Sequence, residues 1–290
     1  MKYKVTHTTE YRYSEQVSLC HNIACLLPRS LSYQINHYSD LQIEPSAHLH
    51  AERTDFFGNR LFYFSIQQPH QKLRVTAVSE VELLPRPQTV AQDIPWEKVR
   101  DSMRLIGKSS ESIEIRQFIF ESPMVPITND IREFAKITFT PQKGIFEACY
   151  EMMQRIFHEF SFVSGFTTIA TPLSEVLKHR KGVCQDFAHL AIAAIRSVGL
   201  PARYVSGYIE TIPPPGKEKL IGTDVSHAWY SVYIPNEGWM DFDPTNNMMP
   251  NLQHITIAWG RDYSDVTPLK GIIYGSGSHT LSVSVDVQKI

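Results

Sequence analysis

The sequence has little cysteine, almost no net charge and no long apolar run. None of its apolar stretches approaches the ~18–20 residues of a membrane-spanning helix, so we expect no membrane partner. Residues 1–7 alternate like a strand and lack the apolar centre of a signal peptide. With 28 basic and 30 acidic residues, the chain offers no basic surface for nucleic acid. Four cysteines in 290 residues are too few for a disulfide framework, so the expected location is the cytoplasm.

The first 85 residues predict a domain built of β-strands. Short runs with alternating or β-branched side chains recur over residues 11–14, 17–24, 40–43, 60–66 and 72–78. The sequence Asp-Phe-Phe-Gly-Asn at residues 55–59 predicts a tight turn, since Gly58 tolerates a positive φ. This spacing is typical of a sandwich or barrel, and we expect a β-sandwich over residues 1–85. His48 and His50 lack the third ligand of a metal site.

A proline-rich segment follows this domain. Pro85, Pro87 and Pro95 exclude a long helix or a central strand, so we expect a linker over residues 86–100 and a second domain over 101–290. Apolar residues at steps of three and four then predict helices, over residues 110–120, 130–137, 143–159 and 173–178. After residue 200 a period of two predicts strands, over residues 202–210, 226–234, 239–243 and 281–287, with a polar loop at 213–222. The expected fold class is α+β.

One further predicted helix, over residues 184–198, carries the most informative side chain. Its apolar residues repeat at helical steps, and a glycine and a proline end it. Cys184 lies at its N-terminus, where unpaired N–H groups and the helix dipole favour a thiolate, and Arg180 and Lys181 precede it. Most lone cysteines are small buried hydrophobes. This helix alone therefore leaves a nucleophile and a structural cysteine equally open.

Cysteine catalysis also needs a base and a group that orients it. His189 shares the helix but lies about 140° around it from Cys184, which argues against it. His227 and Asp243 lie on two successive predicted strands, and with Cys184 they would form a Cys-His-Asp triad. The thiolate would attack a carbonyl, His227 would protonate the leaving amine, and Asp243 would fix the histidine tautomer. Asp241 alternates onto the same face as Asp243 and is its rival.

The turn between these two strands decides whether the triad can form. Side chains alternate between the two faces of a sheet. A four-residue loop over residues 235–238 would put His227 and Asp243 on opposite faces, whereas a three- or five-residue loop puts them on one face, diagonal to each other. Gly238 can adopt the left-handed conformation that a three-residue loop with a bulge requires. We therefore predict an odd loop and a hydrogen bond between His227 and Asp243.

Four segments resemble the transglutaminase-like superfamily. They are Gly-Val-Cys-Gln-Asp-Phe-Ala-His-Leu at residues 182–190, Gly-Leu-Pro-Ala-Arg-Tyr-Val-Ser-Gly-Tyr at 199–208, His-Ala-Trp at 227–229 and Gly-Trp-Met-Asp-Phe-Asp-Pro-Thr at 238–245. They are most similar to its bacterial cysteine protease branch, whose triad of cysteine, histidine and aspartate corresponds to Cys184, His227 and Asp243. The turn at residues 55–59 and the sequence Gly-Arg-Asp-Tyr-Ser-Asp at 260–265 also fit this branch.

The resemblance implies a papain/transglutaminase-like cysteine-peptidase fold after the β-sandwich, and acyl transfer from a peptide or amide bond through a thioester. Hydrolysis of a peptide or protein substrate is the expected reaction, with no cofactor and no metal. The alternatives are a protein-glutamine transglutaminase, which uses an amine as acceptor, and a non-catalytic scaffold that binds peptides. No tryptophan matches the oxyanion donor of animal transglutaminases, and Phe162 in that region has no donor. The backbone N–H of Cys184 remains as the oxyanion donor.

Overall fold

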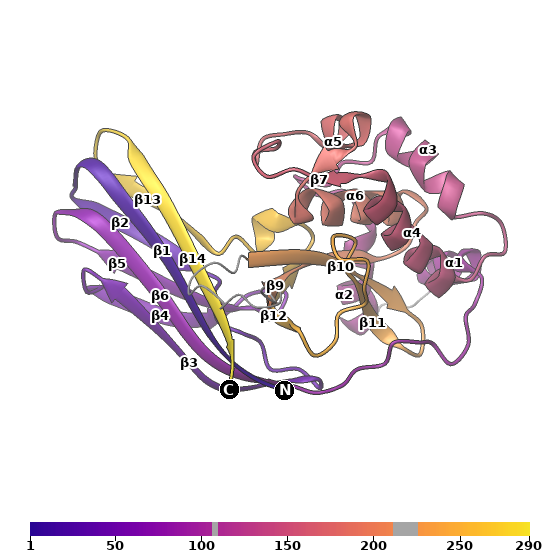
Figure 1. Ribbon diagram of the computed structural model, residues 1–290, viewed down its shortest axis with the longest axis horizontal. Helices are drawn as coiled ribbons and strands as arrows, with labels where there is room; N and C mark the ends of the chain where they lie inside the picture. The colour runs from indigo at the N-terminus through magenta and orange to yellow at the C-terminus, as the bar shows by residue number, and fades with distance from the viewer. Residues whose placement is uncertain (106–109, 211–225) are drawn as a thin grey trace, which may run out of the picture.

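The computed structural model describes residues 1–105, 110–210 and 226–290 and divides into two parts (Figure 1). Sheets built mainly from the N-terminal strands form one part, and a mixture of helices and strands forms the other. The predicted loop over 213–222 lies outside the described residues. No helix in the described ranges is both long and apolar enough to cross a bilayer.

Two four-stranded antiparallel sheets make up the first part, which confirms the predicted β-sandwich. Their strand orders are β14-β1-β6-β3 and β13-β2-β5-β4. The strands are β1 (Lys2–Val17), β2 (Leu19–Ala24), β3 (Gln34–Glu44), β4 (Leu49–Thr54), β5 (Arg60–Ile66), β6 (His70–Leu83), β13 (Leu269–Tyr274) and β14 (His279–Lys289). From Leu73 to Leu83 every second residue of β6 is buried, as expected for a strand with one face on a core.

The last two strands of the chain complete both sheets of the sandwich. Strand β14 pairs with β1 from Tyr3–Lys289 to Tyr13–His279, and β13 pairs with β2. The sequence analysis assigned these residues to the second domain over 101–290, and the pairing corrects that assignment for 269–289. Alternation along a segment predicts a strand but does not identify the strand with which it pairs.

The second part is a four-stranded antiparallel sheet, ordered β11-β10-β9-β12, with helices packed on it. Its helices are α1 (Trp96–Leu105), α2 (Ser110–Arg116), η1 (Gln117–Ile119), α3 (Asn129–Thr138), α4 (Ile145–Glu159), α5 (Leu173–His179), α6 (Cys184–Ser197) and η2 (Tyr263–Asp265). Its strands are β7 (Ser161–Phe162), β8 (Lys181–Gly182), β9 (Ala202–Ile209), β10 (Ser226–Ile234), β11 (Gly238–Phe242) and β12 (His254–Gly260). The predicted linker over 86–100 differs in its last residues, because α1 begins at Trp96.

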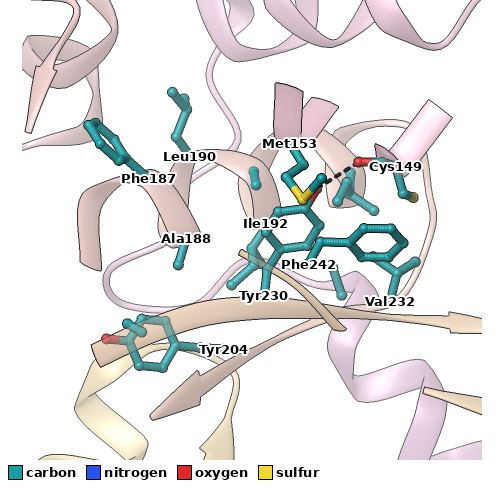
Figure 2. Close-up of a cluster of buried hydrophobic side chains, with 14 of the residues drawn as sticks. Cys149, Met153, Phe187, Ala188, Leu190, Ile192, Tyr204, Tyr230, Val232 and Phe242 are labelled. Carbon is teal, nitrogen blue, oxygen red and sulfur yellow. Dashed lines mark hydrogen bonds between the residues drawn. The ribbon is translucent and has the colours of Figure 1, made fainter. Parts of the chain in front are cut away.

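Helix α6 lies at the centre of this part, and each of its residues from Asp186 to Arg196 is buried. Figure 2 shows Ala188 of α6 above Tyr204 of the sheet and Ile192 next to Tyr230. The Tyr230 hydroxyl donates a hydrogen bond of 2.7 Å to the carbonyl of Cys149 on α4, so the helical layer and the sheet are also joined by a polar contact. Cys149 is fully buried and belongs to this core.

Two carboxamides of the sandwich bind the edge strand β12. The Gln34 side chain donates to the Thr256 carbonyl at 2.7 Å and accepts from the Thr256 amide at 2.8 Å. Asn59 makes the same pair of contacts with Trp259, at 2.8 and 3.0 Å. Each carboxamide thus substitutes for the peptide group of a neighbouring strand and satisfies backbone groups that an edge strand leaves unpaired.

The predicted turn over residues 55–59 positions one of these carboxamides. The Asp55 carboxylate accepts hydrogen bonds from the Phe57 and Asn59 amides at 2.9 and 2.7 Å. Gly58 has a φ of 75°, which a residue with a Cβ adopts only under strain. The turn confirms the prediction and directs Asn59 onto β12.

Candidate active site

The start of α6 presents Cys184 at the first helical position. Asp186 caps the helix by accepting hydrogen bonds from the Val183 amide at 2.8 Å and from the Thr167 hydroxyl at 2.6 Å. A Cβ on Gly182 would lie 2.9 Å from the Asp186 side chain, so only glycine leaves room for this cap. Cys184 is partly exposed, whereas the other three cysteines are buried. The helix therefore offers a thiol that a substrate can reach, next to unpaired N–H groups.

One of the two basic residues before the helix has an acidic partner. Arg180 has a left-handed backbone, with a φ of 53°, and ends α5. Its guanidinium pairs with Glu159 at 3.1 Å and lies 4.7 Å from the centre of the Phe160 ring. Glu159 thus offsets part of the positive charge that the sequence places before Cys184.

The hairpin between β10 and β11 has the predicted odd loop. Ile234 pairs with Gly238, so three residues form the loop, and Gly238 has a φ of 81°. Tyr230 pairs with Phe242, and the next pair in this register sets Asp243 opposite Trp229. His227 and Asp243 then lie diagonally on one face, and His227 Nε2 is 2.7 Å from Asp243 Oδ2. The prediction of this contact is confirmed.

His227 joins the strand pair to the cysteine. Its Nε2 faces Asp243, and its ring also interacts electrostatically with the Cys184 side chain. Burial lowers the pKa of His227, but its interactions with Asp243 and Cys184 outweigh that effect and raise its pKa to about 10. His227 is therefore protonated at neutral pH. A protonated histidine near a thiol is the pairing that cysteine catalysis uses.

Asp243 is fully buried and accepts five hydrogen bonds. Its Oδ2 atom accepts from His227, from His254 at 3.0 Å and from the Asn246 side chain at 2.7 Å. Its Oδ1 atom accepts from the Thr245 and Asn246 amides. Burial raises the pKa of Asp243, but its histidine partners outweigh this and hold it well below its usual range. The carboxylate therefore remains charged.

The sequence analysis missed His254 and Asn246. His254 begins β12, is 1% exposed and donates to Asp243. Burial lowers the pKa of His254, so its ring is neutral. Asn246 Nδ2 lies 3.3 Å from His227 Nε2 as well as contacting Asp243. Proximity to the Asp-Pro-Thr sequence could have indicated Asn246, whereas no local pattern shows that β12 brings His254 to this carboxylate.

The group His227, Asp243 and His254 could also bind a metal ion. One ligand atom from each residue lies within 4.8 Å of the others, and two imidazoles with a carboxylate suit zinc. Yet the separations of 2.7 and 3.0 Å between each Nε2 and Oδ2 are those of N–H···O hydrogen bonds. Hydrogen bonding therefore accounts for this arrangement.

The rival residues have other partners. Asp241 pairs with Arg86 at 2.6 Å and not with His227, so it does not orient the histidine. His189 accepts a hydrogen bond from the Tyr263 amide at 3.1 Å, and its ring packs at a tilt against Tyr204 in the core. Trp229 is fully buried.

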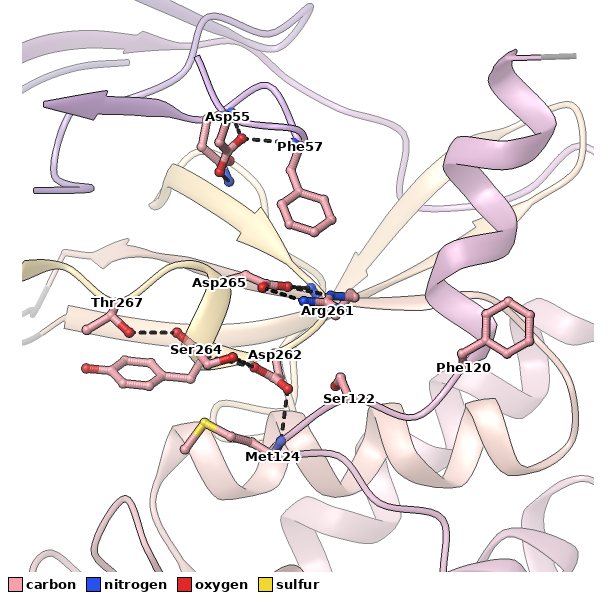
Figure 3. A network of polar contacts seen from close by, with 12 residues as sticks. Asp55, Phe57, Phe120, Ser122, Met124, Arg261, Asp262, Ser264, Asp265 and Thr267 are labelled. Carbon is pink, nitrogen blue, oxygen red and sulfur yellow. Dashed lines mark hydrogen bonds and ion pairs between the residues drawn. The ribbon is translucent and has the colours of Figure 1, made fainter. Parts of the chain in front are cut away.

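Residues 260–265, which fitted the family resemblance, contact the last turn of α6. Figure 3 shows Arg261 directed at Asp265, with two contacts of 2.9 Å. Asp262 is buried and accepts from the Met124 amide at 2.9 Å and from Ser264. Arg196 of α6 donates to the carbonyl of Arg261 at 2.7 Å. This segment therefore fixes the position of the helix that carries the cysteine.

Exposed apolar side chains lie on residues 161–169, a segment that contacts the start of α6. The segment is held by pairing of β7 with β8 and by the bond from Thr167 to Asp186. Its exposed apolar residues are Phe162, Val163, Phe166 and Ile169. Through Thr167 this segment contacts Asp186, two residues after Cys184.

Comparison with known families matches both parts of the chain. Residues 3–82 match the "Bacterial transglutaminase-like N-terminal region" and residues 132–244 match the "Transglutaminase-like superfamily". An uncharacterized protein of Mycobacterium bovis is 40% identical over 295 residues, covering 99% of this chain and 92% of the relative. A protein-glutamine gamma-glutamyltransferase of Pseudomonas aeruginosa is 35% identical over 72 residues, covering 24% of this chain and 11% of that protein.

A solved structure shares the whole fold. It is described as "a Putative Cysteine Protease from Cytophaga hutchinsonii", and it aligns with 100% of this chain and 91% of its own at a TM-score of 0.74 and 21% identity. At that identity the likeness concerns the fold, including the sandwich that precedes the mixed domain.

Proposed function

This chain belongs to the transglutaminase-like superfamily, and we propose that it cleaves peptide or amide bonds with a triad of Cys184, His227 and Asp243. Family membership supports thiol-dependent catalysis in general. The observation that carries the proposal is the 2.7 Å contact between His227 and the buried Asp243, together with the electrostatic interaction of His227 with the partly exposed Cys184 thiol.

In the first step the Cys184 thiolate attacks the carbonyl carbon, a C–S bond forms, and the carbonyl oxygen becomes negative. The backbone N–H of Cys184 would stabilise that oxyanion, aided by the dipole of α6. Because Nε2 of His227 faces Asp243, its Nδ1 is the nitrogen that gives a proton to the leaving amine. The C–N bond then breaks and a thioester remains.

In the second step water attacks the thioester, and His227 accepts the proton of that water. The carboxylate product leaves, and the thiolate and the imidazolium are restored. Asp243 keeps one tautomer and one orientation of His227 through both steps, because its own position is fixed by four further hydrogen bonds.

The proposed substrate is a peptide or protein with apolar residues near the scissile bond. Its apolar side chains would pack on Phe162, Val163, Phe166 and Ile169, which are exposed beside the start of α6. Aromatic and aliphatic side chains exposed in one short segment are typical of a recognition surface.

Alkylation with iodoacetamide, followed by peptide mapping, tests whether the thiol is activated. The other three cysteines are buried and would be alkylated more slowly for that reason alone. The informative comparison is therefore between the alkylation rates of Cys184 in wild type and in His227→Gln. We expect the alkylation rate of Cys184 to fall at least roughly 10-fold in the variant, because the imidazolium that favours the thiolate is lost. Equal rates would support a non-catalytic scaffold.

Digestion of a peptide library tests the reaction itself, with Cys184→Ala as the control. We expect cleavage products that are absent with the variant and that carry one ¹⁸O atom when the reaction is run in H₂¹⁸O. Amine transfer is the second candidate, since one relative is named a protein-glutamine gamma-glutamyltransferase. Incorporation of dansylcadaverine into casein without cleavage would favour that reaction over hydrolysis.

A further inference from the structure

A cavity of about 900 Å³ lies between the sandwich and the second sheet, apart from the cysteine site. None of the three triad residues lines it. Its aromatic lining comes from both domains and includes Tyr33, Phe57, Phe118, Trp239 and Trp259. Its basic lining consists of Arg29, Arg86 and Arg203. A cavity of this size and mixed lining is typical of a small-molecule site.

Arg203 is the central cation of this cavity. It is 5% exposed, and its guanidinium lies 4.2 Å from the centre of the Trp239 ring and 3.7 Å from that of Trp259. Burial lowers its pKa to about 10, so it remains charged at neutral pH. Within the described part of the chain its Nε atom is buried without a hydrogen-bond partner. A buried N–H group of this kind favours an acceptor within the cavity.

Arg86 and Asp241 leave further hydrogen-bonding atoms open. They pair at 2.6 Å, and their side chains are 8% and 5% exposed. Arg86 Nη2 and Asp241 Oδ1 are nevertheless buried without partners among the described residues. Among the described residues, the lining of this cavity therefore has two buried donors without an acceptor, Arg203 Nε and Arg86 Nη2. It also has one buried acceptor without a donor, Asp241 Oδ1.

The most deeply buried charges of the cavity, Arg86, Arg203 and Asp241, sum to one positive charge. Asp55 lies near Arg29 and offsets its charge, while the single carboxylate of Asp241 faces both Arg86 and Arg203. The two glutamates of the lining, Glu114 and Glu237, are less buried and lie where solvent screens them. This balance suits one negative charge and disfavours a dianion such as phosphate.

We propose that this cavity binds a small carboxylic acid as its monoanion. The carboxylate accepts from Arg203 Nε and Arg86 Nη2, and the apolar body packs on Trp239 and Phe118. An N–H or O–H group next to the carboxylate donates to Asp241 Oδ1. An N-acylated amino acid has each of these groups: a carboxylate, an adjacent N–H and an apolar side chain.

Isothermal titration calorimetry with N-acetyl-L-phenylalanine tests the proposal, and its amide, N-acetyl-L-phenylalaninamide, is the matched uncharged ligand. We expect the acid to bind at least roughly 10-fold more tightly than the amide. Arg203→Lys keeps the charge but removes the Nε–H donor, so it weakens binding of the acid at least roughly 10-fold. Arg132→Gln removes a cation from the exposed face of α3 and leaves binding unchanged.

Equal binding of acid and amide would overturn the proposal, as would binding of inorganic phosphate in preference to the acid. Failure of N-acetyl-L-phenylalanine, benzoate and hexanoate to bind at 10 mM would also overturn it. If Arg203→Lys does not fold by circular dichroism, Arg86→Lys replaces it and the same loss is expected. Because alkylation of Cys184 is measured separately, failure of this site is distinguishable from failure of the proposed catalysis.

Discussion

His254 donates a hydrogen bond to the same Oδ2 atom of Asp243 that His227 contacts, at 3.0 Å. His254 begins β12 and Asp243 follows directly after β11, at opposite edges of the sheet order β11-β10-β9-β12, so their side chains meet across its face. Gly207 of β9 makes this possible, because a Cβ there would lie 2.5 Å from the Trp229 ring that packs against His254. The aspartate thus orients one histidine while another histidine orients the aspartate.

Replacing His254 with phenylalanine should lower kcat and leave KM unchanged. The variant loses one hydrogen bond to a buried carboxylate, about 1.5–3 kcal/mol, which corresponds to roughly a 10- to 100-fold lower rate. His189→Phe is the control, because it removes a buried histidine that does not contact the triad. Steady-state kinetics on a peptide identified from the library would measure both. An equal loss in both variants would mean that His254 only supports the fold.

Asp243→Asn should reduce kcat/KM far more than Asp241→Asn. The first change removes the charge that holds His227 protonated and oriented, and we expect a loss of roughly 10³- to 10⁴-fold with some residual activity. The second removes a carboxylate that pairs with Arg86, so the loss should stay within roughly 10-fold. Cys184→Ala and His227→Ala should abolish turnover. A greater loss for Asp241→Asn would contradict the assignment of the orienting residue.

The stability contributed by His227 should depend on pH. Its pKa rises from 6.5 to about 10 on folding, so the folded state binds its proton more tightly than the unfolded state. This contribution is complete below pH 6.5 and is lost as pH increases through about 10. Urea unfolding of wild type and His227→Gln at intervals from pH 6 to 10 measures it. The difference in free energy of unfolding should shrink across this range, and a constant difference would rule out the protonated state.

Removal of metal ions should leave activity unchanged. Both Nε2 atoms and the shared Oδ2 atom are engaged in hydrogen bonds, so the proposed steps need no metal. Added Zn²⁺ should inhibit, because coordination of His227 would displace the proton that it holds. Activity after dialysis against EDTA, and after addition of micromolar ZnCl₂, measures both effects. Loss of activity on dialysis that Zn²⁺ restores would show that the group is a metal site.

Gln34→Ala should destabilise the protein without changing its chemistry. The fully buried Gln34 carboxamide satisfies both backbone groups of Thr256, and its loss leaves them unpaired at a cost of about 1–3 kcal/mol. Gln42→Ala on the exposed part of the same strand is the control. Thermal unfolding should show a lower Tm for Gln34→Ala alone. A normal Tm would mean that water replaces the carboxamide.

Local patterns predicted most of the elements and the contact between His227 and Asp243. The predicted strand over 226–234 agrees with β10. The prediction from the loop length is also confirmed, because a three-residue loop puts His227 and Asp243 on the same face of the sheet. These features depend on residues close in sequence. Sequence reasoning counted on Arg180 to support a thiolate at Cys184. It could not show that Arg180 pairs with Glu159, because that contact comes from the packing of α4 against the end of α5.

Contacts between distant segments could not be predicted in the same way. His254 reaches Asp243 only because β12 pairs with β9, and alternation in 254–260 contains no information about that partner. The cavity that contains Arg203 depends on the docking of two domains, which neither domain's sequence specifies alone.

The pairing of Tyr3 with Lys289 makes the second domain an insertion within the sandwich. Strand β1 precedes the inserted domain in the chain and β14 follows it, so neither sheet is complete until the inserted domain has been synthesised. Buried residues of both strands, Tyr3 and Val287, belong to the same hydrophobic core as α6, so that core is also completed only when β14 pairs. Since the two chain ends lie side by side (Figure 1), joining them with a short linker and opening the chain near residue 90 would yield a permuted protein in which the sandwich strands are contiguous.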